Sequence, residues 1–132
     1  MAKKTKGRVV MVLVDSNTII YLSKNLISVD DVFDDSGEYA ISVITYMEVL
    51  GFEFESDAEK EFIEKVFSCL EIIYIDQAIA SKVLHIKRAN KIKLPDAIIC
   101  ATAIVNNATL ITNDIRLKSI EDLKVKILGI KN

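Results

Sequence analysis

Short apolar runs alternate with amphipathic stretches along this chain. Residues 9–14 form a continuous apolar run that Asp15 ends, which predicts a buried strand leading into a helix. Further short strands are expected at 40–42, 71–75, 109–112 and 125–130.

Helical spacing fills the intervals between these strands. Helices are expected to begin at the capping residues Ser42, Ser56 and Asp76, and another has Pro95 in its first position. Gly51 can end the first of them. The apolar faces expected to be buried are Phe62, Ile63, Val66, Phe67 and Leu70 in one helix, and Ile79, Val83 and Ile86 in the next.

The alternating order predicts an α/β fold. We expect a three-layer α/β/α sandwich with a mostly parallel sheet of about five strands and right-handed crossovers. Ligands in such folds bind in the crevice at the carboxyl ends of the strands.

Length and composition agree with this architecture. A chain of 132 residues with 51% hydrophobic residues can bury a core as one domain over 1–132, with 1–8 as a flexible basic tail. The longest apolar run is far shorter than the roughly 20 residues of a membrane helix, so no membrane span is expected. Cys69 and Cys100 form neither a CxxC pair nor a zinc pattern with the single histidine, which favours a reducing cytoplasm.

Charge is distributed unevenly along the sequence. Residues 30–64 hold twelve of the nineteen acids and one base, Lys60. Residues 77–95 hold five bases and no acid, and are interpreted as a strip facing nucleic-acid phosphates; a solvated helix face is the alternative. The bases of this strip are Lys82, Lys87, Arg88, Lys91 and Lys93.

Four acids are placed to meet at the expected binding edge. Asp15 and Asp114 each end a strand, whereas Glu48 and Asp96 lie on helices that leave the same edge. Crowded carboxylates stay ionised only when a cation neutralises them, and all-oxygen ligands select Mg²⁺ or Mn²⁺. Taken singly, Asp15 and Asp96 are typical helix caps, Glu48 a solvent-facing residue and Asp114 a turn residue.

Four motifs that contain these acids follow one another along the chain. They are Val-Asp15-Ser16-Asn17, Ser42-x-x-Thr45-x-x-Glu48, Leu94-Pro95-Asp96-Ala97 followed by Ala101-Thr102-Ala103, and Leu110-Ile111-Thr112-Asn113-Asp114. In this order and spacing they resemble the motifs of PIN domains. The resemblance implies a five-stranded parallel sheet and Mg²⁺- or Mn²⁺-dependent cleavage of RNA. It assigns catalysis and metal binding to Asp15, Glu48, Asp96 and Asp114, and a supporting role to Ser16, Thr112 and Asn113.

In its length the chain is most similar to the VapC-type toxins of toxin-antitoxin pairs. That likeness implies two partners, an RNA substrate and a small antitoxin that blocks the acidic groove, and leaves a homodimer open. The chain departs from the toxins at Leu117, where they usually carry phenylalanine.

Three alternative functions fit the sequence less well. One is a PIN-fold RNA-binding or assembly module that does not cleave, against which the presence of all four acids argues. A receiver-like phosphoacceptor domain would need an adjacent acidic pair after the first strand, where only Asp15 stands. Nucleotide-binding enzymes are disfavoured because neither GxGxxG nor GxxxxGK[ST] occurs.

Overall fold

The computed structural model describes residues 10–34 and 37–129 and contains a five-stranded sheet. All strand pairs are parallel, and the strand order is β3-β2-β1-β4-β5. The strands are β1 (Val10–Val14), β2 (Gly37–Ser42), β3 (Glu71–Ile73), β4 (Thr109–Thr112) and β5 (Lys124–Ile127).

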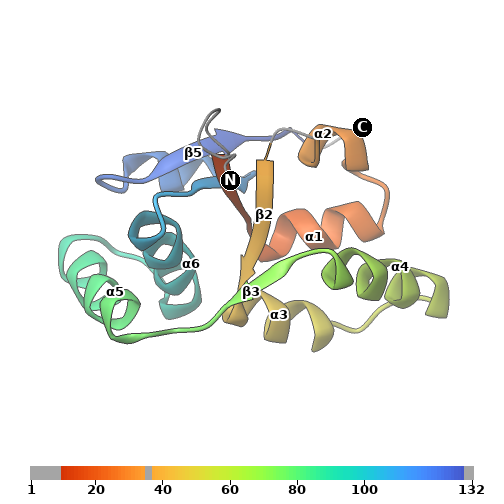
Figure 1. Cartoon of the computed structure of the whole chain (residues 1–132), viewed down its shortest axis with the longest axis horizontal. Coiled ribbons are helices and arrows are strands. Elements are labelled where there is room, and N and C mark those ends of the chain that lie inside the picture. Colours follow the sequence, from red (N-terminus) through yellow and green to blue (C-terminus); the bar gives the residue numbers. More distant parts are fainter. Residues whose placement is uncertain (1–9, 35–36, 130–132) are drawn as a thin grey trace, which may run out of the picture.

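Helices cover both faces of this sheet (Figure 1). Helices α5 and α6 lie on one side, and α1, α3 and α4 lie on the other. The helices of the described residues are α1 (Ser16–Ser23), α2 (Val29–Val32), α3 (Val43–Leu50), α4 (Asp57–Ser68), α5 (Gln77–Ala89) and α6 (Leu94–Val105), with a 3₁₀ helix η2 (Ile115–Ser119). The predicted three-layer α/β/α fold is confirmed.

The apolar strands divide their side chains between two cores. Leu13 and Leu110 pack with α5 and α6, whereas their neighbours Val14 and Ile111 pack with α1 and α4. Successive side chains of a strand point to opposite faces, so a continuous apolar run is needed wherever both faces are covered. This explains why the central strands lack the polar alternation of a half-exposed sheet.

The strand order places a switch point between β1 and β4. The chain leaves β1 toward β2 and β3, and then returns to the other side of β1 with β4. In a parallel α/β sheet the crevice at such a point, beyond the carboxyl ends of the strands, is where ligands bind. Asp15 follows β1 and Asp114 follows β4 by two residues, so both lie at this crevice.

Most helix boundaries agree with the expected capping residues. The Ser42 and Ser56 side chains accept hydrogen bonds from Ile44 N and Glu59 N, and Asp76 accepts one from Ile79 N. Glu59 Oε1 in turn accepts a hydrogen bond from the N–H of Glu55, the residue before the Ser56 cap. These caps satisfy backbone N–H groups that the first helical turn leaves without partners.

Three strands were predicted with wrong boundaries, and two of the predicted strands extend outside the described residues. The strand expected at 71–75 ends at Ile73, because it pairs with β2 and Ile73 lies opposite the last β2 residue, Ser42. The strand expected from Ala40 begins earlier, at Gly37, because pairing with β1 starts there. The strand expected at 125–130 spans Lys124–Ile127; residue 130 lies outside the described residues, as do residue 9 and the expected tail at 1–8.

Within the described part of the chain, no helix is both long and apolar enough to span a bilayer.

Candidate active site

Asp15 is held rigidly at the carboxyl end of β1. It is the N-cap of α1, and its Oδ1 accepts a hydrogen bond from Thr18 N at 2.9 Å. Its Oδ2 accepts from the Thr112 hydroxyl in a short hydrogen bond. The side chain is nearly buried, with the residue 7% exposed. The capping role considered for Asp15 is therefore present, and it also fixes the carboxylate at the crevice.

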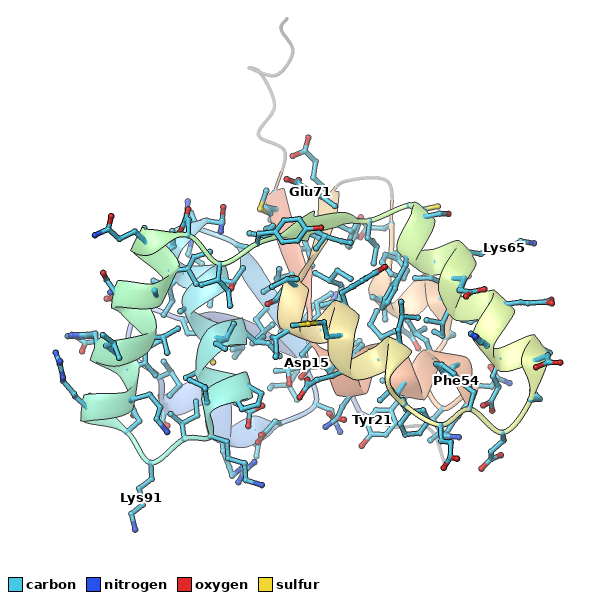
Figure 2. All side chains as sticks on the ribbon, turned by 90° about the horizontal axis from the view of Figure 1, so that it is seen from below. Asp15, Tyr21, Phe54, Lys65, Glu71 and Lys91 are labelled. Atoms are coloured by element: carbon cyan, nitrogen blue, oxygen red, sulfur yellow. The ribbon has the colours of Figure 1, made fainter. Side chains whose placement is uncertain are left out.

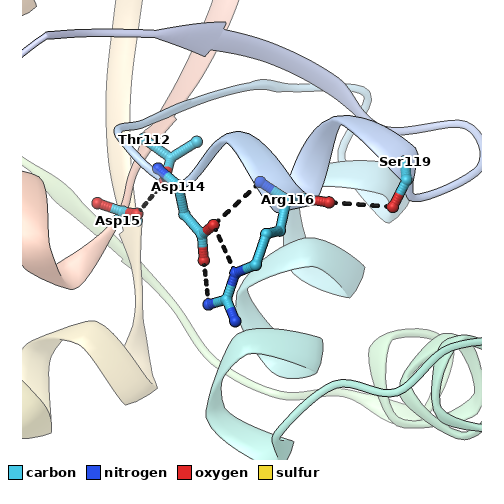
Figure 3. Close-up of polar contacts among 5 residues, drawn as sticks. All are labelled: Asp15, Thr112, Asp114, Arg116 and Ser119. Carbon is cyan, nitrogen blue, oxygen red and sulfur yellow. Dashed lines mark hydrogen bonds and ion pairs between the residues drawn. The ribbon is translucent and has the colours of Figure 1, made fainter.

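Thr112 and Asp114 extend this network from β4 (Figure 3). The Thr112 hydroxyl donates to Asp15 and accepts from Asp114 N at 3.0 Å. The Asp114 carboxylate caps η2 by accepting from Arg116 N at 3.0 Å. It also accepts two hydrogen bonds from the Arg116 guanidinium, with Nε 3.0 Å from Oδ1 and Nη2 2.7 Å from Oδ2. Asn113 is half-buried in the turn between them.

Glu48 reaches the site from α3. The Ser16 hydroxyl donates to Glu48 Oε1 at 2.6 Å and lies 3.1 Å from Thr45 Oγ1. Thr45 is fully buried, whereas Glu48 is exposed, so the hydrogen bond from Ser16 orients the Glu48 carboxylate while the residue stays open to solvent. A contact between α1 and α3 thus orients the second acidic motif.

Asp96 lies in the first turn of α6 and is half-buried. It does not cap this helix, whose N-cap is Lys93 and has no side-chain capping bond. The helix dipole favours a negative charge at this end. Its carboxylate is therefore not committed to capping, unlike those of Asp15 and Asp114.

The acids influence one another's ionisation. Burial raises the pKa of Asp15, opposed by hydrogen bonds from Thr112 and Thr18, and the charge of Asp96 raises it further. Burial also raises the pKa of Asp96, and the charges of Asp114 and Glu48 act in the same direction. Ionised carboxylates in this crevice are thus disfavoured by lost hydration and by mutual repulsion.

Asp114 behaves in the opposite way. Its hydrogen-bonded pair with Arg116 holds the pKa of Asp114 below the ordinary value. Arg116 and Lys93 also oppose the rise in the pKa of Asp96. Positive charges of this chain therefore neutralise part of the acidic cluster.

The four acids influence one another's charge but do not converge on a single metal position. Among residues 10–34 and 37–129, no three Asp, Glu, His or Cys side chains are close enough together to hold one metal ion. Both oxygens of Asp15 are directed to hydrogen-bond donors, and both oxygens of Asp114 are directed to Arg116. A shared ion would require at least the Asp114 side chain to change partners.

A groove of about 750 Å³ adjoins Asp96. Three bases of the predicted strip line it, Lys87, Lys91 and Lys93, together with Arg116. Lys87 also donates from Nζ to Ile92 O at 2.7 Å, which ties α5 to the loop before α6. The basic strip is therefore partly gathered beside the acids.

The other two bases of the strip lie elsewhere. Lys82 lines a small separate hollow with His85 and Asp122, and Arg88 is exposed without lining the groove. Successive residues of a helix differ by about 100° in direction, so one helix cannot turn all its bases to one groove. Figure 2 shows Lys91 projecting from the loop beyond α5, with Asp15 near the middle of the molecule and Lys65 on α4 at the other end.

Sequence reasoning missed two residues beside the site. Arg116 follows Asp114 by two positions, a spacing that lets a side chain fold back on the residue capping its own turn. Cys100 is fully buried on α6, and burial together with the charges of Asp96, Asp15 and Asp114 raises its pKa to about 12. Its thiol is thus protonated at neutral pH.

Comparison with known proteins identifies the family. The PIN domain family model matches residues 12–123, which include all four acids. The chain belongs to the PIN domain family. This confirms the resemblance found in the sequence motifs. Among curated protein sequences, none is significantly similar to the chain.

Solved structures share the PIN fold of this chain. The structure of VapBC2 from Rickettsia felis, bound to a DNA fragment from its promoter, is similar with a TM-score of 0.78 at 20% identity, over 90% of this chain and 99% of that one. DNA-bound VapBC from Salmonella typhimurium has a TM-score of 0.77 at 23% identity, over 90% of this chain and 98% of that one. A toxin-antitoxin complex from Klebsiella pneumoniae has a TM-score of 0.66 at 30% identity, over 85% of this chain and 94% of that one.

Proposed function

We propose that this PIN domain is a Mg²⁺- or Mn²⁺-dependent endoribonuclease that hydrolyses RNA phosphodiester bonds. The observation that carries the proposal is the position of Asp15, Asp96 and Asp114 at the switch point of the sheet. There, burial and repulsion raise the pKa of two of these acids. Such perturbed groups in a cleft are typical of functional sites. Membership of the PIN family supports a nuclease.

The donor set fits a hard divalent cation. Asp15, Asp96 and Asp114, with Glu48, would hold the ion through carboxylate oxygens, which Mg²⁺ and Mn²⁺ prefer. A bound ion would supply Lewis acidity toward the phosphodiester and the attacking water. A divalent charge would also remove the repulsion that raises the pKa of Asp96.

The remaining residues of the motifs position these acids. Thr112 orients Asp15 through its hydroxyl and orients the Asp114 backbone by accepting its N–H. Ser16 orients Glu48. We assign Asn113 to the turn that joins Thr112 to Asp114 at the end of β4.

RNA would lie along the groove beside Asp96. Lys91 and Lys93 line it together with Lys87, and the ammonium groups of lysine favour a phosphate backbone over a neutral ligand. Lys82 and Arg88 are left out of this surface because they do not line the groove. The bound RNA would then run from the lysine-lined side of the groove to the acidic crevice.

We further propose that the chain is the toxin of a toxin-antitoxin pair and acts in the cytoplasm as a single domain. Support comes from its similarity to the Klebsiella pneumoniae toxin-antitoxin complex and to VapBC structures. The partner would be a small antitoxin that presents arginine or lysine to the four acids and to the acid-rich segment 30–64. The alternative occupant of that face is a second copy of this chain in a homodimer.

A second function has a specific observation in its favour. The Arg116 pair and the absence of three gathered acids among the described residues suit a PIN module that binds RNA without cleaving it. Calorimetric titration with Mn²⁺ separates the two functions. The nuclease proposal requires binding by the wild-type protein and loss of that binding in Asp15→Asn and Asp96→Asn; equal binding by the variants and the wild type would place any ion elsewhere.

A further inference from the structure

Arg116 lies between the acidic site and the groove. Its guanidinium pairs with both oxygens of Asp114 and also lowers the pKa of Asp96, so its charge reaches two of the acids. The same residue lines the groove with Lys91 and Lys93. Its side chain is 82% exposed, so the guanidinium can leave Asp114 without unpacking the core.

The pair is not needed to build the turn. Asp114 Oδ1 already caps η2 by accepting from the Arg116 backbone N–H at 3.0 Å. That hydrogen bond remains when the Arg116 side chain is changed. The side-chain pair therefore adds charge neutralisation to a turn that has its own cap.

The pair also occupies the oxygens that a metal ion would use. Arg116 donates to Oδ1 at 3.0 Å and to Oδ2 at 2.7 Å, so an ion that binds Asp114 competes with the guanidinium for this carboxylate. An exposed ion pair of this kind is weak, because water and salt screen it. A divalent cation, which also interacts with Asp96, can therefore displace it.

We propose that Arg116 is an exchangeable counter-ion of the acidic site, an inference that rests on the proposed function. It holds Asp114 in the metal-free protein, and a divalent cation displaces it. The released guanidinium then faces the groove, where it binds an RNA phosphate beside Lys91 and Lys93. Guanidinium matches carboxylate and phosphate with the same two-donor geometry, so one side chain can serve both partners in turn.

The test compares Mn²⁺ affinity in the absence of RNA. Arg116→Gln removes the charge and the two-donor grip, and Arg116→Lys keeps the charge alone. Lys65→Gln removes one positive charge from an exposed site on α4 and serves as the control. Calorimetry should show Mn²⁺ binding that is tighter by about three- to tenfold in Arg116→Gln, with an intermediate gain in Arg116→Lys and none in Lys65→Gln.

Two further readouts follow the guanidinium itself. In the wild-type protein, Mg²⁺ should shift the NMR signal of the Arg116 Nε–H group, because its acceptor is lost. With Mg²⁺ present, Arg116→Gln should bind a non-hydrolysable single-stranded RNA analogue more weakly and with a shallower salt dependence than Lys65→Gln does.

Each result separates this inference from the proposed function. Equal Mn²⁺ affinity in the wild type and Arg116→Gln, or weaker binding in the variant, overturns the counter-ion role and leaves the nuclease proposal standing. Binding by neither protein overturns both. Binding by Arg116→Gln alone supports the counter-ion role in its strongest form. Unchanged RNA affinity in that variant overturns the transfer of Arg116 to phosphate.

Discussion

Thr112→Val tests how the site holds Asp15. The change keeps the shape of a fully buried side chain but removes the hydroxyl that donates to Asp15 Oδ2 and accepts from Asp114 N. A hydrogen bond to a buried charged group contributes about 1.5–3 kcal/mol. We therefore expect a loss of about 2 kcal/mol in the free energy of unfolding at pH 8.

The corresponding change in melting temperature follows from the size of the chain. An unfolding entropy of about 2.1 cal/mol/K per residue makes 2 kcal/mol equivalent to roughly 7 °C for a chain of this length. Thr112→Ser is the matched control: it keeps the hydroxyl and loses a methyl group, which costs about 1 kcal/mol. Urea and thermal unfolding in chelator should rank wild type, Thr112→Ser and Thr112→Val in falling stability.

The pH dependence and a double-mutant cycle identify the partner. The Thr112 hydrogen bond lowers the pKa of Asp15, so it favours the ionised carboxylate. The stability lost in Thr112→Val should therefore shrink as the pH falls and Asp15 becomes protonated. It should also shrink in an Asp15→Asn background. A loss independent of both pH and Asp15 would refute the view that Thr112 acts through this carboxylate.

Three further predictions concern Asp15, the groove and the antitoxin. Burial raises the pKa of Asp15 in the folded protein, so ionisation of this carboxyl group lowers the stability as the pH rises from the ordinary value of 3.8 through the folded pKa. Metal-free Asp15→Asn should therefore be at least as stable as wild type at pH 7, and this advantage should vanish near pH 3.8; a clearly lower melting temperature of the variant at pH 7 would contradict this. For RNA binding, Lys91→Ala and Lys93→Ala should each reduce the slope of log affinity against log salt by about one unit, whereas Lys82→Ala and Arg88→Ala should not, as measured by fluorescence anisotropy; equal effects at all four positions would remove the groove from the account. Raising the Mn²⁺ concentration should weaken the affinity of the antitoxin for this chain, because the basic side chains of the antitoxin and the ion compete for the same carboxylates. Charge reversal of those side chains should abolish inhibition, whereas an antitoxin affinity independent of Mn²⁺ would count against the shared site.

The elements that periodicity could define were predicted well. Ile79, Val83 and Ile86 repeat at helical spacing and are buried on α5 as expected. The central strands were recognised because apolar cover on both faces leaves an uninterrupted apolar run. Such signals lie within a few neighbouring residues, so they are visible without the fold.

Features that depend on packing between elements were not visible in the sequence. Residues 74 and 75 look like strand residues, but Tyr74 is 66% exposed beyond the point where β2 can pair. The short helix α2 (Val29–Val32) lacks the length for a periodic pattern and was not predicted. Its capping box, in which Ser28 and Asp31 exchange hydrogen bonds, is by contrast a local Ser-x-x-Asp pattern that the sequence carries.

The site was predictable in its location and less so in its contacts. Strand ends placed Asp15 and Asp114 at one crevice, because the carboxyl ends of parallel strands share an edge. The sequence could not show that Arg116 occupies Asp114, since an ion pair depends on side-chain direction within a turn. Nor could it separate Lys91 and Lys93 from Lys82. The direction of Lys82 depends on how α5 is rotated against the sheet, whereas Lys91 and Lys93 lie in the loop between α5 and α6.

Cleavage of RNA under controlled metal conditions decides whether this PIN domain is a metal-dependent ribonuclease. The purified protein, freed of any bound partner, is incubated with mixed single-stranded RNAs in Mg²⁺, Mn²⁺ or chelator, beside Asp96→Asn with its melting temperature recorded. We predict cleavage in either metal, none in chelator, and a loss of at least about 100-fold in Asp96→Asn without a loss of stability. Cleavage that persists in chelator, or an Asp96→Asn variant as active as wild type, would contradict the account.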